Sequence, residues 1–151
     1  MSCLPSWKKR PCFCENPLTD QPVPAPGTLT ENDIYKAIGA EGISQLVRAF
    51  YEQVPTDDIL GPMYPVEDLQ GAEVRLRMFL IFRFGGPQDY LQHRGHPKLR
   101  LRHAPFAIDQ KARDRWVRLM DNALLSCHFQ PDATEVIRVF FSGVASFLIN
   151  R

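Results

Sequence analysis

The apolar residues of most of the chain recur at helical spacing and predict a succession of amphipathic helices. A short first helix is expected after Thr30, because Gly39 and Gly42 interrupt the pattern. A second helix is expected over about 43–54, where Pro55 stops it. The apolar positions of this second helix fall on one face: Ile43, Leu46, Val47, Phe50, Tyr51 and Val54.

Three later segments continue the helical pattern. Helices are expected over about 67–84, 109–126 and 131–149, and Gly85-Gly86-Pro87 ends the first of them abruptly. The stretch 87–105 is rich in histidine, glycine, proline and arginine, which predicts a loop with one or two short helices. No segment alternates with a period of two, so the predicted fold class is all-α.

The first 27 residues differ in composition from the rest. Six of the 13 prolines lie there, which predicts an extended and solvated segment. We therefore expect a proline-rich flexible N-terminal extension, 1–27, and one folded domain, 28–151. Three of the four cysteines, Cys3, Cys12 and Cys14, lie in the extension, and their spacing differs from that of common zinc sites. A tail in a reducing compartment is a simpler interpretation than a metal or redox site.

Charge and hydropathy exclude several classes of function. The chain of 151 residues has 18 basic and 17 acidic residues, which argues against a nucleic-acid partner held by bulk charge. No apolar run reaches the ~20 residues that cross a bilayer, and no signal-peptide segment follows the basic residues 8–10. We expect a cytoplasmic protein with no membrane or nucleic-acid partner.

Among the four histidines, His103 is the strongest candidate for a metal ligand. Its apolar neighbours, such as Leu101 and Phe106, favour a neutral imidazole. His93 and His96 lack a cysteine or carboxylate partner at zinc-site spacing, and the common nucleophile and phosphate-binding motifs are absent. One histidine among apolar helices suits a large organic cofactor. The same residues are also compatible with a histidine whose role is purely structural.

An ordered set of short motifs, taken together, resembles the group II truncated haemoglobins. In chain order they are Phe50-Tyr51-Glu52-Gln53-Val54, Tyr64-Pro65, Gly71-Ala72-Glu73, Arg75-Leu76-Arg77-Met78-Phe79-Leu80, Gly85-Gly86-Pro87, Arg94-Gly95-His96-Pro97, Leu101-Arg102-His103-Ala104-Pro105-Phe106 and Arg115-Trp116. The similarity covers the chain from about Leu29 onward, and the extension has no counterpart in the family's common core. The resemblance implies a truncated globin fold, a two-over-two helical sandwich around haem.

The resemblance also implies a role for individual residues. His103 would be the proximal ligand of haem b iron. Tyr51, Tyr64 and Trp116 would form the polar distal cluster, and Ala72 would take the place of the distal histidine of ordinary globins. Leu76 would limit the space above the iron, and Arg75 and Arg102 are candidates for the haem propionates. An ion pair between Arg75 and Glu73 or Glu67 on a solvated face is the alternative for that arginine. The apolar residues expected to line the haem are Phe50, Leu76, Phe79, Leu80, Leu101, Phe106 and Leu119.

The implied function is the binding of dioxygen and other diatomic ligands, for redox handling of oxygen, nitric oxide or peroxide. A haem-dependent peroxidase or nitric oxide dioxygenase is the catalytic alternative. It would need a separate reductase, because the sequence has no flavin or nicotinamide domain. A haem-free helical interaction domain, with the extension as its binding segment, is the third possibility. Both a monomer and a homodimer are compatible with the sequence.

Overall fold

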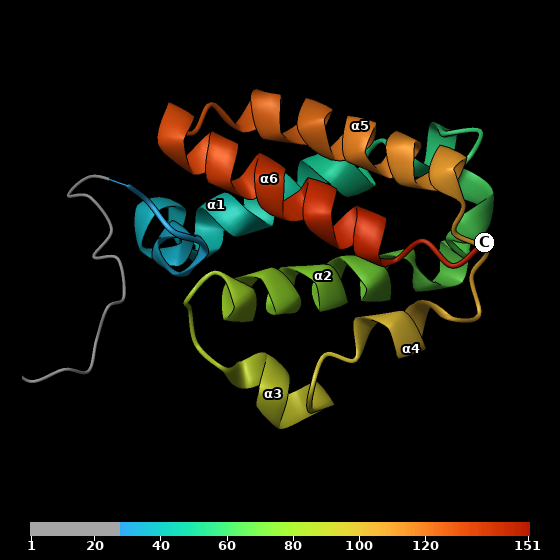
Figure 1. Ribbon diagram of the computed structural model, residues 1–151, viewed down its shortest axis with the longest axis horizontal. Coiled ribbons are helices and arrows are strands. Elements are labelled where there is room, and N and C mark those ends of the chain that lie inside the picture. The colour runs from blue at the N-terminus through green and yellow to red at the C-terminus, as the bar shows by residue number, and fades with distance from the viewer. Residues whose placement is uncertain (1–27) are drawn as a thin grey trace, which may run out of the picture.

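The computed structural model describes residues 28–151, which fold as helices joined by short connections (Figure 1). The α-helices of this part are α1 (Ile34–Tyr51), α2 (Leu69–Arg83), α3 (Asp89–Arg94), α4 (Leu99–His103), α5 (Gln110–Cys127) and α6 (Pro131–Phe147). Short 3-10 helices span Glu31–Asp33, Val54–Thr56, Gly61–Met63 and Val66–Asp68. The predicted extension and its three cysteines lie outside the described residues.

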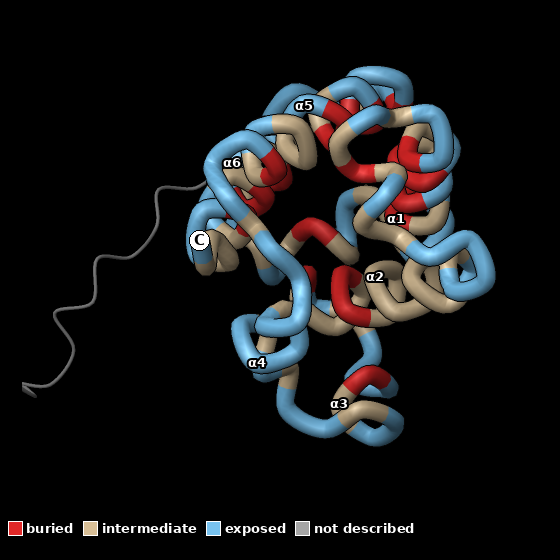
Figure 2. The backbone as a smooth tube through the Cα atoms, turned by 90° about the vertical axis from the view of Figure 1, so that its right-hand side faces the viewer, coloured by how far each residue is buried: buried red, intermediate tan, exposed pale blue. Residues whose placement is uncertain are grey.

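Two pairs of long helices form the body of the domain. α1 packs against α2 and α5, and α5 packs against α6. Figure 2 shows that the buried parts of these four helices face one another, whereas α4 is largely exposed. Both views place the short helices α3 and α4 beyond α2, on its side away from α5 and α6. The predicted all-α class and the two-over-two sandwich are confirmed.

The first two predicted helices form one element with a bend. Gly39 has φ +67° and ψ 178°, a conformation that glycine adopts without strain, and the chain changes direction there. Gly42, the second predicted interruption, is instead buried within the helix, where an added Cβ would lie 3.3 Å from the Phe129 ring. The helix ends at Tyr51, and Val54 belongs to the following 3-10 turn rather than to the helix as predicted.

Gly85, which follows the end of α2, also lets the end of α2 and the start of α1 come together. Gly85 has φ +90°, and a Cβ at this position would overlap the carbonyl oxygen of Asn32. The absence of a side chain lets the end of α2 approach the start of α1, where the Tyr35 N–H donates to the Phe84 carbonyl at 2.9 Å. The glycine that ends the helix is therefore also required for packing.

Helix α5 begins at the predicted cap. The carboxylate of Asp109 accepts a hydrogen bond from the Ala112 N–H at 2.8 Å, which satisfies a donor that the first helical turn leaves unpaired.

The largest fully buried side chains of the core are Phe50, Phe84, Ile34, Ile43, Leu46 and Leu80. Among residues 28–151, no helix combines the length and hydrophobicity needed to cross a bilayer.

Candidate functional site

A cavity of about 340 Å³ lies inside the helical sandwich, and residues from α1 through α6 line it. Cavities of this size are typical of small-molecule and cofactor sites. The structure places ten of the predicted site residues on the wall of this one cavity: Tyr51, Tyr64, Ala72, Arg75, Leu76, Phe79, Arg102, His103, Phe106 and Trp116. These residues come from distant parts of the chain, so the fold gathers them.

His103, at the end of α4, has one of its two ring nitrogens hydrogen-bonded to the backbone. Its Nδ1 lies 2.7 Å from the carbonyl oxygen of Leu99, one helical turn earlier. Because a carbonyl only accepts hydrogen bonds, Nδ1 carries the proton, and the lone pair of the neutral ring resides on Nε2. A backbone partner of this kind orients metal-ligating histidines in general. The imidazole therefore has the tautomer that a metal ligand at Nε2 requires.

Asn150 fastens the loop that follows His103. Its Nδ2 donates to the carbonyls of Phe106 at 2.9 Å and His103 at 3.3 Å, and its Oδ1 accepts from the Ile108 N–H at 3.0 Å. An asparagine near the end of the chain has no local pattern that predicts this contact. Sequence reasoning missed Asn150 for that reason.

An aromatic cluster forms another part of the cavity wall. Tyr51 ends α1, Tyr64 follows the 3-10 turn Gly61–Met63, and Trp116 lies on α5. The rings of Tyr51 and Tyr64 meet edge to face with centroids 5.8 Å apart, and Trp116 packs against Phe50 at 5.5 Å. Burial raises the pKa of both phenols, and the neighbouring Trp116 side chain partly opposes this rise at Tyr64. Both tyrosines are therefore protonated at neutral pH and are able to donate hydrogen bonds.

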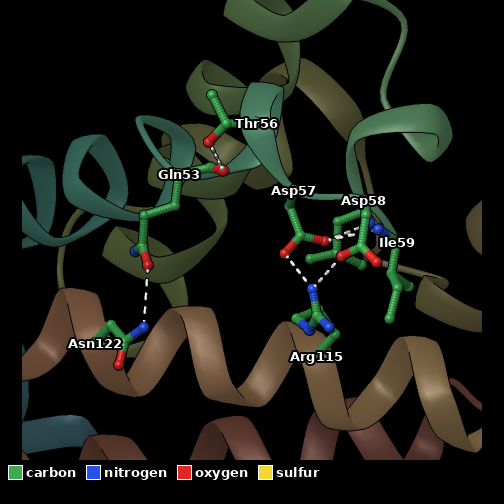
Figure 3. Close-up of polar contacts among 8 residues, drawn as sticks. Gln53, Thr56, Asp57, Asp58, Ile59, Arg115 and Asn122 are labelled. Atoms are coloured by element: carbon green, nitrogen blue, oxygen red, sulfur yellow. Dashed lines mark hydrogen bonds and ion pairs between the residues drawn. The ribbon is translucent and has the colours of Figure 1, made fainter.

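A polar junction connects the loop before Tyr64 to α5 next to Trp116 (Figure 3). Nη1 of Arg115 donates to Oδ2 of Asp57 at 2.7 Å and to Oδ1 of Asp58 at 2.6 Å. The other oxygen of Asp57 accepts from the N–H groups of Ile59 and Leu60 at 3.0 and 2.7 Å. The turn over 57–60 is thus capped by its own first residue and linked to α5 by an ion pair.

The two aspartates of this junction differ in burial. The side chain of Asp57 is 7% exposed and that of Asp58 is 80% exposed. Burial by itself raises the pKa of Asp57, but the hydrogen bonds from Leu60, Arg115 and Ile59 outweigh it and hold the pKa below its usual value.

Replacing Asp57 with alanine is expected to lower the free energy of unfolding by about 1–3 kcal/mol, because it leaves enclosed N–H groups without an acceptor. The pKa of Asp57 is lower in the folded state, so its stabilisation is present above the unfolded value of about 3.9 and is lost as the pH falls through the folded value. Urea unfolding at several pH values measures both effects. Asp58→Ala is the matched control, and a loss as large for Asp58 would contradict the assignment.

The side chains of Arg75 and Arg102, both at the cavity, are hydrogen-bonded to other groups of the protein. Arg75 pairs with Asp68, with Nη2 2.5 Å from Oδ2, rather than with Glu73 or Glu67 as the alternative had it. Arg102 donates from Nε to the Pro97 carbonyl and from Nη2 to the Arg94 carbonyl, both at 2.8 Å.

The structure adds two arginines to the site and removes four apolar residues from it. Arg94 and Arg113 also line the cavity, and helical spacing in the irregular segment gave no means of orienting Arg94. Phe50, Leu80 and Leu119 do not line the cavity as expected, since they are buried in the helical core. Leu101 is 69% exposed, because it lies two residues before His103 on α4 and therefore on nearly the opposite face of the helix.

The donor set fits a porphyrin better than a bare metal ion. Within residues 28–151, no group of three or more histidine, cysteine, aspartate or glutamate side chains is placed to hold a metal. A single imidazole beside a mainly apolar cavity is what haem iron requires of a globin-type site.

Comparison with known proteins agrees with this chemistry. The sequence model of the bacterial-like globin family matches residues 33–148. Group 2 truncated hemoglobin YjbI of Bacillus subtilis is 42% identical over 120 residues, which cover 80% of this chain and 90% of the relative. This chain belongs to the group II truncated haemoglobins.

Solved structures of haemoglobins share the fold of this truncated haemoglobin. The haemoglobin of Thermobifida fusca aligns with a TM-score of 0.75 at 41% identity, covering 78% of this chain and 96% of the other. That of Chloroflexus aurantiacus also has a TM-score of 0.75, at 38% identity, covering 78% and 98%. The cofactor of this truncated haemoglobin is haem, and haem-based binding of diatomic ligands is its general function.

Proposed function

We propose that His103 is the axial ligand of the haem iron and that Tyr51, Tyr64 and Trp116 hydrogen-bond a diatomic ligand in the same cavity. The observation that carries this proposal is the bond from His103 Nδ1 to the Leu99 carbonyl, which leaves the lone pair on Nε2 beside the cavity. When bound, haem supplies the open coordination position at which a diatomic ligand is held.

The chain's own residues would hold the cofactor from several sides. Leu76, Phe79 and Phe106 offer apolar surface to the macrocycle. Arg75 and Arg102 are proposed for the propionates, because guanidinium groups match carboxylate geometry. Arg94 joins them as a candidate, since it lines the cavity and makes no ion pair with any residue that the structure describes.

The distal donors would slow the release of a polar ligand. Ala72 has no donor, so hydrogen bonding falls to the two protonated phenols and the indole N–H of Trp116. Each such bond in an enclosed cavity contributes about 1–2 kcal/mol, which is roughly tenfold in the dissociation rate. Slow release suits redox handling of oxygen, nitric oxide or peroxide better than transport.

A haem-dependent peroxidase or nitric oxide dioxygenase is the catalytic form of the same proposal. The three donors favour it, because preorganised hydrogen-bond donors stabilise developing charge in an enclosed site. Electrons would come from a separate reductase in the cytoplasm. Turnover of peroxide or nitric oxide with a reductase present would separate this form from simple binding.

Titration of the apoprotein with haemin tests the proposal. We expect a Soret band that saturates at one haem per chain, and a further shift of the band after reduction and addition of carbon monoxide. A folded protein that stays colourless at equimolar haemin would instead favour the haem-free interaction domain. Circular dichroism before and after the titration establishes that the protein is folded.

A further inference from the structure

The segment around α4 concentrates positive charge. The chain has no acidic residue between Asp89 and Asp109, whereas Arg94, Lys98, Arg100 and Arg102 lie within that interval. The whole chain has a net charge of only +1, so this concentration is local. A local excess of one sign attracts partners of the opposite sign over roughly a Debye length, about 8–10 Å at ordinary ionic strength.

The cations of this segment have no acidic partner in the described part of the chain. The ion pairs there involve arginines of α2, α5 and α6, namely Arg75, Arg83, Arg113, Arg115 and Arg138. Lys98 and Arg100 are exposed and do not line the cavity. Their charge is therefore available at the surface, even if Arg94 and Arg102 serve the cofactor.

Exposed apolar side chains lie among these cations. Leu101 is 69% exposed, Phe147 is 55% exposed and Phe106 is 42% exposed. The guanidinium of Arg100 lies 5.3 Å from the centre of the Phe147 ring, which joins the end of α6 to α4. We call the surface formed by Lys98, Arg100, Leu101, Phe106 and Phe147 the α4 face. Apolar residues mixed with arginine are typical of the centre of a protein–protein interface.

The α4 face borders the cofactor cavity. Phe106 belongs to both, and Arg102 and His103 continue the same helix into the cavity wall. Figures 1 and 2 show α3 and α4 on the side of α2 away from α5, and the end of α6 meets α4 through Phe147. A protein seated on the α4 face would therefore lie against the edge of the haem site.

We propose that the α4 face docks an acidic one-electron carrier protein that reduces the haem; this inference rests on the proposed function. The carrier loses one electron and the ferric haem iron gains it, with no atom or proton exchanged. The mixture of cations and exposed apolar groups favours a protein partner over a nucleic acid. α4 has only five residues, which is too short for an amphipathic helix that lies on a membrane.

Titration calorimetry with a plant-type [2Fe–2S] ferredoxin of acidic surface tests the docking in the haem-loaded protein. The double variant Lys98→Glu/Arg100→Glu is expected to raise the Kd at least tenfold at low salt, because opposite charges across an interface become like charges. Sodium chloride should weaken binding of the unmodified protein and have little effect on the variant. Lys36→Glu/Arg118→Glu, which reverses two exposed cations on α1 and α5, is the matched control and should leave the Kd unchanged.

The rate of anaerobic reduction provides the second readout. Reduced ferredoxin should reduce the double variant more slowly, while dithionite should reduce all forms alike. If a haem-loaded variant binds ferredoxin as tightly as the unmodified protein, the docking proposal is wrong. The same holds if charge reversal abolishes binding to anionic lipid vesicles but leaves the ferredoxin complex intact. Failure of the proposed function itself is distinct, since the unmodified protein would then form no Soret band.

If the double variant does not take up haem, Lys98→Gln/Arg100→Gln replaces it, since neutral side chains disturb the helix bearing His103 less. A smaller rise in Kd, about threefold or more, is expected for this pair. An unchanged Kd in this variant would also overturn the proposal.

Discussion

Replacing His103 with alanine is expected to abolish the iron–histidine bond. The imidazole is held by the 2.7 Å bond from Nδ1 to the Leu99 carbonyl, which fixes its orientation and leaves Nε2 free to bind a metal. The cavity wall has no second histidine within residues 28–151 that could replace it. Resonance Raman spectroscopy of the ferrous protein should show an iron–histidine stretch that disappears in the variant, together with loss of the normal Soret band.

The matched control for this experiment is His93→Ala. His93 makes the same kind of contact, from Nδ1 to the Asp89 carbonyl at 2.8 Å, but it is exposed and lies outside the cavity. Its replacement should leave the stretch and the Soret band unchanged. Addition of free imidazole to His103→Ala should restore a nitrogen ligand in the space left by the side chain. An iron–histidine stretch that persists in His103→Ala would remove this residue from the axial position.

The second large effect is expected at the distal cluster. Tyr51→Phe and Trp116→Phe should each increase the dioxygen dissociation rate about tenfold, because each removes a donor worth about 1–2 kcal/mol. Stopped-flow or flash-photolysis measurements give the rates directly. Tyr35→Phe removes a phenol that packs near Gly86, outside the cavity, and should have no effect.

A double-mutant cycle tests whether the distal residues act together. The side chains of Tyr64 and Trp116 interact, and this interaction lowers the pKa of Tyr64 relative to burial alone. We therefore expect the effects of Tyr64→Phe and Trp116→Phe on the dissociation rate to be non-additive. Strict additivity would show that the two donors act independently, and unchanged rates in all single variants would contradict the distal assignment.

Helix positions were predictable wherever the pattern is local. The stop at Gly85, the cap at Asp109 and the loop with short helices after α2 all follow from residues within one or two turns. Two details of this pattern were predicted wrongly. Gly42 continues the helix and packs closely against Phe129, which lies far along the chain. α1 ends at Tyr51, and Val54 is the first residue of the 3-10 turn that follows.

The candidate site residues came from the ordered motifs and not from periodicity. An amphipathic pattern shows that Leu76 or Trp116 faces inward, but it does not distinguish a cavity wall from a packed core. The same limit explains Phe50 and Leu119, which periodicity placed inward correctly and which lie in the core rather than at the cavity.

The sequence by itself determined the helical class and the order of the helices, because these depend on spacing along short stretches. Only the tertiary structure decided which side chains share a cavity and what holds them. Arg115 meets Asp57 across 58 positions, and Asn150 fastens the His103 loop across 47. Contacts between residues so far apart in the sequence produce no periodic pattern along the chain, because they depend on how whole helices pack.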